Sequence, residues 1–149
     1  MTTSNHLYTG AAVALTVQRP ITGMVLALLS HFLLDILPHY GQKSESVISW
    51  FKHRATWLVE GLNLVGIPLL VFLLWGQPWW IFMAALLAIA PDITWIFRYL
   101  YYERYGLVAS KYMLTRFHDR IQRWERPWGA AIEIVFFVSV VSVLFGLVY

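Results

Sequence analysis

The residues of this sequence that could do chemistry are a few ionisable side chains set inside apolar segments. His31 and Asp35 are four residues apart, so on a helix their side chains are neighbours on one face. An imidazole and a carboxylate at this spacing can hold one divalent metal ion, with a structural hydrogen bond between them as the alternative. His39 follows four residues later, but Pro38 favours an end of the helix before it, which places His39 at the mouth of the site.

Four more ionisable residues lie in comparable positions. Asp92 follows Pro91, and the freed backbone of a helix broken at a proline often borders a polar cavity. His6 opens the first apolar segment, where it could bind a metal or only cap the helix. Glu60 and Glu133 lie early in long apolar segments. Each could act as a general base, orient a metal ligand or form a hydrogen bond between packed helices. The chain has no cysteine, so the ligands would be nitrogen and oxygen, which suit zinc, manganese or iron more than copper(I).

Apolar helices must position these side chains. The 149-residue chain is 59% hydrophobic and 13% charged, whereas soluble domains are about one-quarter charged. The apolar segments cover about residues 6–17, 21–37, 55–75, 79–102 and 128–148. We therefore expect an all-α fold, a single integral membrane domain over residues 1–149 built as a polytopic transmembrane helix bundle of four to five segments. The first segment is short for a span of about 20 residues, so it either crosses or forms a re-entrant hairpin with the second.

An amphipathic helix is expected over about residues 106–124. Leu114, Phe117 and other apolar residues recur on one helical stripe, and basic residues take the other side. Such a helix lies on a membrane surface and is attracted by anionic lipid. The predicted headgroup contacts are Arg116, Arg120 and Arg123, while His118 in the same stretch is a secondary candidate for the site. The position of this stretch beside the bilayer argues against nucleic acid as a partner.

The basic residues predict the orientation of the chain. The stretches after the second and fourth segments hold ten of the eleven Lys and Arg residues, and Arg19 alone lies on the other side. The positive-inside rule then places the N-terminus and both basic loops in the cytoplasm. At 1.5 Å rise per residue, the six intramembrane ionisable residues all lie within roughly 10 Å of the cytoplasmic face. A one-sided group favours a site over a conduit, which needs polar residues through the full depth of the membrane.

Three stretches resemble elements of the bacterial inner-membrane metal-dependent hydrolases: Ser30-His31-Phe32-Leu33-Leu34-Asp35-Ile36-Leu37-Pro38-His39, Asn5-His6 and Ala90-Pro91-Asp92-Ile93. That group is similar to zinc-dependent phospholipase C in its use of His and Asp on a helical scaffold. The resemblance implies that His6, His31, Asp35 and Asp92 are metal ligands. The order of the Ser-His-x3-Asp and Pro-Asp elements is reversed here, and Thr94 stands where the group has a second Asp. His53-Arg54-Ala55-Thr56-Trp57 lacks the final His of the group's His-Arg element.

The chain more closely resembles a family of small bacterial polytopic membrane proteins of unassigned activity. The family shares the Ser-His-x3-Asp-x2-Pro-His element and a later stretch like His118-Asp119-Arg120-Ile121-Gln122 through Glu125-Arg126-Pro127-Trp128-Gly129 to Glu133. This likeness covers most of the chain. It implies roles for His118 and Glu133 and a place in the bacterial inner (cytoplasmic) membrane.

Two function hypotheses follow. The first is a metal-dependent hydrolase of a lipid or lipid-phosphate ester at the cytoplasmic leaflet, with Glu60 or Glu133 as general base. Its divalent metal, zinc first and manganese or iron as alternatives, would lower the pKa of a bound water. The second is a non-enzymatic ion- or proton-coupled carrier or scaffold, whose buried His, Asp and Glu residues are structural or titrate protons. Membrane lipids are the expected partners, and the sequence is compatible with a homo-oligomer.

Overall fold

The computed structural model describes residues 1–40, 54–93, 117, 120–121 and 124–149. These residues form five α-helices, one 3-10 turn and two short strands. In chain order they are α1 (Thr3–Val17), α2 (Pro20–Ile36), β1 (His39–Tyr40), α4 (Arg54–Leu73), α5 (Trp79–Ile89), η1 (Ala90–Asp92), β2 (Glu125–Arg126) and α8 (Gly129–Val148). The predicted all-α fold is confirmed by this predominance of helix. Most of the expected interfacial helix, including Arg116, His118 and Arg123, lies outside the described residues, as do residues 94–102 of the fourth segment.

Prolines and caps explain where the helices begin and end. Pro20 occupies the first position of α2, where its missing N–H has no intrahelical partner to lose. The same helix ends at Ile36, because Leu37 precedes Pro38 and adopts an extended backbone with ψ 152°. Between α1 and α2, Gln18 takes the left-handed conformation with φ 52° and donates its N–H to the Ala14 carbonyl. The tight turn from Gln18 to Pro20 lets α2 fold back along α1.

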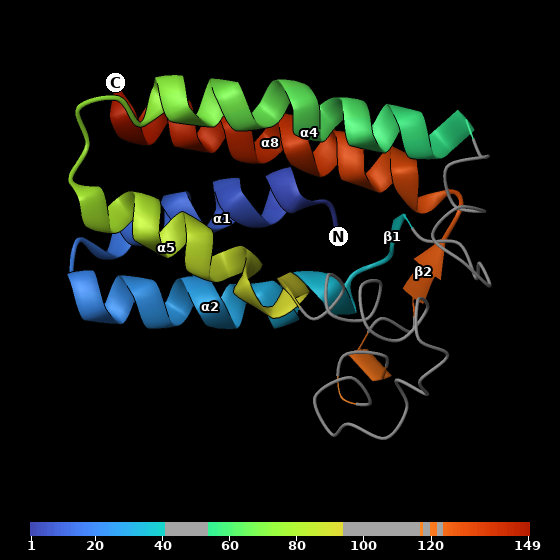
Figure 1. The fold of residues 1–149 in the computed structure, drawn as a ribbon, viewed down its shortest axis with the longest axis horizontal. Coiled ribbons are helices and arrows are strands. Elements are labelled where there is room, and N and C mark those ends of the chain that lie inside the picture. Colours follow the sequence, from blue (N-terminus) through green and yellow to red (C-terminus); the bar gives the residue numbers. More distant parts are fainter. Residues whose placement is uncertain (41–53, 94–116, 118–119, 122–123) are drawn as a thin grey trace, which may run out of the picture.

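Helix α1 is the centre of the bundle. It packs against α2, α5, α8 and α4, and Figure 1 shows it between the α4–α8 pair and the α2–α5 pair. Small residues permit the closest of these contacts: a Cβ added at Gly10 would lie 2.7 Å from Ala88 Cβ and 2.9 Å from the Ala84 carbonyl oxygen. Small side chains at helix crossings are typical of membrane bundles, where close backbone packing replaces hydrophobic driving force.

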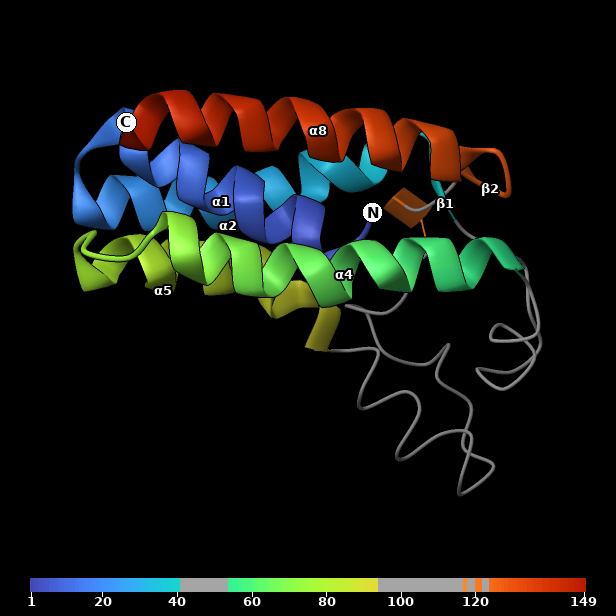
Figure 2. The same ribbon diagram turned by 90° about the horizontal axis from the view of Figure 1, so that it is seen from above.

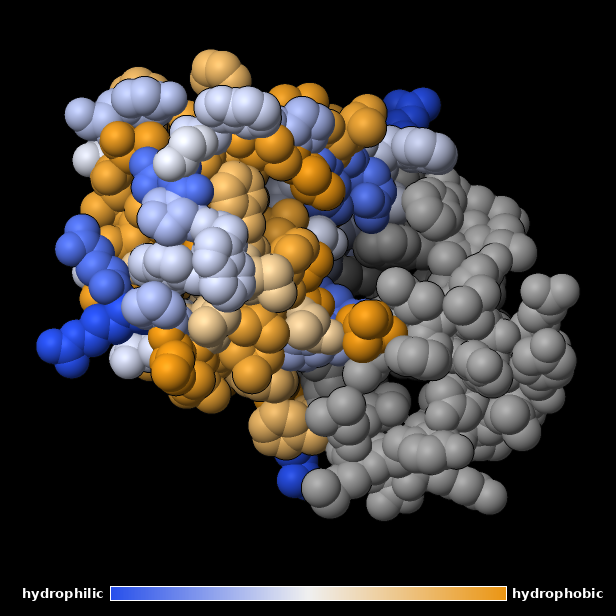
Figure 3. All heavy atoms as spheres, turned by 60° about the vertical axis from the view of Figure 1, so that its left-hand side comes forward, coloured by the Kyte–Doolittle hydropathy of each residue, from blue (hydrophilic) through white to orange (hydrophobic). Residues whose placement is uncertain are grey.

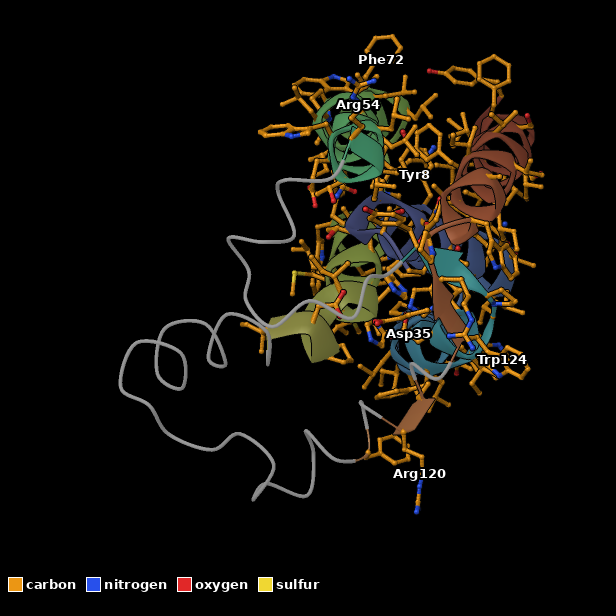
Figure 4. The ribbon with its side chains drawn as sticks, turned by 90° about the vertical axis from the view of Figure 1, so that its right-hand side faces the viewer. Tyr8, Asp35, Arg54, Phe72, Arg120 and Trp124 are labelled. Atoms are coloured by element: carbon orange, nitrogen blue, oxygen red, sulfur yellow. The ribbon has the colours of Figure 1, made fainter. Side chains whose placement is uncertain are left out.

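Two of the described helices are long and apolar enough to cross a membrane. They are α4 over Thr56–Leu73 and α8 over Gly129–Val148, and only 28% and 17% of these stretches are buried. Leu64 is 78% exposed and Phe72 is 67% exposed, and Figure 4 shows Phe72 pointing outward from the bundle. Apolar side chains also cover much of the described surface in Figure 3. The shorter helices, Pro20–Ile36 and Trp79–Asp92, are apolar too, so the number of spans, four to five in the sequence analysis, stays a prediction.

A two-residue parallel pairing was not anticipated by the all-α expectation. His39 of β1 lies opposite Glu125 of β2, at the end of the bundle where α4 and α8 begin (Figure 2). Tyr40 extends the contact to α4, because its hydroxyl lies 2.8 Å from Thr56 Oγ1. A Cβ at Gly129 would collide with the His39 backbone, so α8 can start at this place only with a glycine. The pairing therefore joins the end of α2 to the starts of α4 and α8.

Candidate metal centre

The direction of the helices brings the ionisable residues to one end of the bundle. Helices α1, α4 and α8 begin at this end, and α2 and α5 finish there (Figure 1). The principal predicted site residues lie in the first two turns of α1, α4 and α8, in the last turns of α2, and in the 3-10 turn η1 directly after α5. The up-and-down arrangement thus gathers side chains that are far apart in the sequence.

Three of these residues form a compact group, which we name the histidine–aspartate cluster: His6, His31 and Asp35. His6 Nε2 lies 3.1 Å from Asp35 Oδ1, and His31 Nε2 lies 3.2 Å from Asp35 Oδ2. The two imidazole rings are stacked with centroids 4.2 Å apart. All three side chains are fully buried, and Figure 4 shows Asp35 among α1, α2 and α5. Their ligand atoms lie within 4.8 Å of one another, so the cluster could hold a metal ion.

A backbone carbonyl fixes the orientation of His31. The last carbonyls of a helix have no intrahelical partner, and α5 ends at Ile89, so the Ala88 carbonyl accepts a hydrogen bond from His31 Nδ1 at 2.8 Å. A carbonyl can only accept, so Nδ1 carries a hydrogen and Nε2 faces Asp35. Metal-binding histidines are commonly held in this way by a carbonyl on the second ring nitrogen. Without a cation, a proton on either Nε2 or the carboxylate would have to lie between these two groups.

Asp35 is contacted from several sides. The amino nitrogen of Met1 lies 2.7 Å from Oδ1, the oxygen that also meets His6 Nε2. His6 Nδ1 is buried and has no hydrogen-bond partner among the described residues. A buried nitrogen without a partner is costly. Two imidazoles and a carboxylate fit the nitrogen and oxygen ligands that zinc accepts.

Asp92 lies at the rim of the cluster. Its Oδ1 is 3.7 Å from His31 Nε2, and its side chain is 26% exposed. The 3-10 turn η1 after α5 sets this position, because Pro91 cannot continue the helix. The cluster therefore has a second carboxylate on its more open side, at a longer distance than Asp35.

Glu133 makes a different set of contacts, which we name the Glu133 anchor: Glu133, Thr2 and Asn5. The Thr2 N–H lies 3.0 Å from both carboxylate oxygens, and Thr2 Oγ1 donates to Oε2 at 3.0 Å. Asn5 Nδ2 also donates to Oε2, at 2.5 Å. Glu133 is fully buried. Among the described residues, every group that binds its carboxylate belongs to Thr2 or Asn5, at the beginning of α1.

Glu60 reaches the same turn of α1 through an asparagine. Asn63 Nδ2 donates to Glu60 Oε2 at 3.1 Å, and Asn63 Oδ1 accepts from the Ser4 N–H at 2.9 Å. Within the described part of the chain, the hydrogen bonds of Glu60 and Glu133 thus lead to the start of α1 rather than to the imidazoles of the cluster.

His39, a secondary candidate, lies outside the cluster. His39 is buried, donates from Nδ1 to the Leu37 carbonyl at 2.8 Å and faces Glu125 Oε1 at 3.8 Å. Arg120 lies at the outer edge of the described structure in Figure 4 and points away from Asp35. Thr2 was not among the candidates from the sequence, although a threonine directly before a helix is a recognisable N-cap signal. Glu125, the partner of His39, was not among them either, and the sequence offers no local signal for it.

No family model, curated protein or solved structure matches the chain. The resemblance to metal-dependent hydrolases and to small bacterial membrane proteins therefore stays a prediction. The function has to be argued from the geometry of the cluster and its surroundings.

Proposed function

We propose that this chain is a membrane-embedded metal-dependent hydrolase with one divalent ion in the histidine–aspartate cluster. His6, His31 and Asp35 would be ligands, and Asp92 would complete the set from the rim. The observation that carries this proposal is the orientation of His31, with Nδ1 on the Ala88 carbonyl and Nε2 toward two carboxylates. A cation between these groups would satisfy all of them at once. Zinc is the first choice for such nitrogen and oxygen ligands, with manganese or iron as alternatives.

The proposed location is the bacterial inner membrane, with several spans and with the N-terminus and the basic loops in the cytoplasm. The exposed apolar faces of α4 and α8 support it, because large apolar surfaces of this kind are typical of contact with lipid or with a partner. The distribution of Lys and Arg supports the orientation. The metal site would then lie at the cytoplasmic end of the bundle.

The proposed substrate is a lipid or lipid-phosphate ester. A bound metal ion lowers the pKa of water and polarises a phosphoryl or acyl oxygen. The substrate would approach on the side of Asp92, since the three residues of the histidine–aspartate cluster are fully buried. Arg120, together with Arg116 and Arg123 from the predicted interfacial helix, would bind an anionic headgroup. Because Glu60 and Glu133 hold the start of α1, we propose that they orient this turn rather than act as general base.

One observation favours a second candidate function. The Asp35 carboxylate already meets the Met1 amino nitrogen and two imidazoles. These contacts could lock α1 to α2 without a metal ion, in a scaffold or a proton-titrating carrier. A buried ion pair of this kind often contributes specificity of packing rather than stability.

Metal content separates the two candidates. We would measure it by elemental mass spectrometry on detergent-purified wild type, His31→Ala and Asp35→Ala, with His39→Ala as the matched control. The control removes a buried imidazole at the same end of the bundle but outside the cluster. Near-stoichiometric metal in wild type and control, lost in both cluster variants, supports the site. Wild type without metal after zinc loading overturns it in favour of helix locking.

The reaction needs its own test. Hydrolysis of phospholipid, phosphatidate and polyprenyl phosphate in mixed micelles would be followed with the zinc-loaded wild type and with Asp35→Ala. Zinc-dependent release of product, absent from the variant, supports the hydrolase. Zinc binding without hydrolysis of any of these lipids would leave the metal site standing and remove the proposed reaction.

A further inference from the structure

The Glu133 anchor leads directly to a residue of the proposed metal site. Thr2 is the N-cap of α1, and its side chain accepts from the Asn5 N–H at 3.4 Å. The Thr2 carbonyl in turn accepts from the backbone N–H of His6 at 3.2 Å. Glu133 is thus separated from the His6 backbone by a single residue. Any movement of Thr2 displaces the turn that carries the imidazole.

The anchor resembles a capping box whose acid comes from another helix. In a capping box, a Glu at the third helical position reaches back to the N–H of the N-cap residue. Here Asn5 occupies that position, and Glu133 of α8 accepts the Thr2 N–H instead. A carboxylate beside a helix N-terminus is also favoured by the helix dipole. Glu133 of α8 therefore accepts the N–H of the N-cap residue of α1, as a glutamate of the same helix does in a capping box.

A second helix holds the same turn from another side. Ser4 donates from its N–H to Asn63 Oδ1 and from its hydroxyl to the Leu62 carbonyl, at 2.9 and 3.3 Å. Gly66 allows this approach, because a Cβ there would lie 2.7 Å from Ser4 Oγ. With α4 on one side and α8 on the other, the rotation of α1 about its axis is set. That rotation decides whether the His6 ring can stack on His31.

We propose that Glu133 is a positioning residue, which fixes the first turn of α1 so that His6 stacks on His31 and reaches Asp35. The inference rests on the metal site proposed above for its consequence on metal affinity. The anchoring of the turn itself can be measured without metal. Glu133 acts through Thr2 and Asn5, so its contribution should depend on the match of donors and acceptors at these two residues.

A donor–acceptor swap tests this dependence. Asn5→Asp places a carboxylate against the Glu133 carboxylate, where Asn5 Nδ2 now donates. Aspartate in the first turn of an isolated helix is favourable, so a loss would come from the meeting with Glu133. In the double variant Asn5→Asp/Glu133→Gln, the glutamine amide can donate to the new carboxylate, and its oxygen can still accept from Thr2. The swap should therefore restore the contact between the two side chains. The bond from Asn5 Nδ2 to the Glu133 backbone carbonyl, at 3.2 Å, stays lost in both variants.

The variants would be compared by two measurements in detergent. Zinc affinity would be obtained by chelator competition, and hydrogen exchange of the first turn of α1 would be followed in the zinc-free protein. Ser142→Ala is the control, since this exposed side chain bonds only within α8 among the described residues. We expect Asn5→Asp and Glu133→Ala to weaken zinc binding at least tenfold and to speed exchange in this turn. The control should lie within about threefold of wild type, a change smaller than the 10–100-fold loss typical of residues that support a ligand. The double variant should lie between Asn5→Asp and wild type in both measurements.

Two results would overturn the inference. One is wild-type zinc affinity and exchange in both single variants. The other is a double variant as impaired as Asn5→Asp, which would mean general disruption rather than a specific pairing. If wild type binds no zinc, the proposed metal site fails, and exchange alone decides whether Glu133 anchors the turn. Failure of the site and failure of the anchor are thereby distinguished.

Discussion

Asp35 and Glu133 are two buried carboxylates at the same end of the bundle, and their neighbours differ in kind. The neighbours of Glu133 are a peptide N–H, a hydroxyl and an amide, which neither titrate near neutral pH nor give way to a metal ion. The neighbours of Asp35 include an amino nitrogen and two imidazoles, which can lose protons and can bind metal. Burial alone therefore does not identify a carboxylate as a metal ligand or a catalytic group. The groups that surround it do.

The largest difference between the two residues should appear in zinc affinity when each is made neutral. Asp35→Asn removes a charged ligand, so we expect zinc binding to weaken by at least about 100-fold, beyond the 10–100-fold typical of residues that only support a ligand. Glu133→Gln keeps an acceptor for Thr2, and Asn5 Oδ1, which lacks a partner among the described residues, can accept from the new amide after a flip. Its affinity should stay within about tenfold of wild type. Chelator competition measures both, and equal losses would erase the distinction.

Acidification should separate the two regions next. Imidazoles bind metal only when neutral, so protons compete with zinc as the pH falls through the range where histidine becomes charged. We expect zinc affinity to fall at least about tenfold between pH 7.5 and 5.5. In the zinc-free protein, the difference in hydrogen exchange of the first turn of α1 between wild type and Glu133→Ala should be the same at both pH values, because the N–H, hydroxyl and amide that bond to Glu133 do not titrate in this range. A flat zinc affinity would count against His31 as a ligand.

The sequence predicted the parts of the cluster that lie on one helix or at one end of the fold. The spacing of His31 and Asp35 fixes their side chains on one face of α2, as found at 3.2 Å. The alternating direction of the apolar segments, with the basic residues at one side, also predicted that His6 and Asp92 would lie at the same end as His31. The break at Pro91 indicated freed backbone and a polar cavity near Asp92. The bond from His31 to the Ala88 carbonyl at this end of α5 was not predicted.

Contacts between helices were less predictable. Helices that are apolar on every side, like α8, carry little information about which face turns inward. The sequence could not show that Glu133 faces the N-cap of α1 while Asp35 faces the imidazoles, so both carboxylates were candidates for chemistry. The pairing of His39 with Glu125 joins residues that lie far apart in the chain, and two-residue strands leave no periodic pattern.

A smaller effect is expected at the rim of the cluster. Asp92→Asn should weaken zinc binding by about tenfold, less than the loss expected at the buried ligand Asp35, because the Asp92 carboxylate is 3.7 Å from His31 and partly exposed to solvent screening. The same change at Asp35 is the comparison, measured by the same chelator competition. A loss at Asp92 as large as that at Asp35 would show that both carboxylates bind the metal equally.

The smallest effect is expected at Glu60, which, like Glu133, is connected by hydrogen bonds to the start of α1. Glu60→Gln keeps an oxygen for the Asn63 amide, so the free energy of unfolding should change by less than about 1 kcal/mol, the scale of one net hydrogen bond. Zinc affinity should be unchanged, because Glu60 reaches α1 through Asn63 and Ser4 rather than through the imidazoles. Thermal unfolding and chelator competition measure these quantities, and kcat on the lipid substrate completes the set. A general base typically contributes about 100- to 10,000-fold to rate. A loss of kcat of this size at constant zinc affinity would mean that Glu60 acts as the general base.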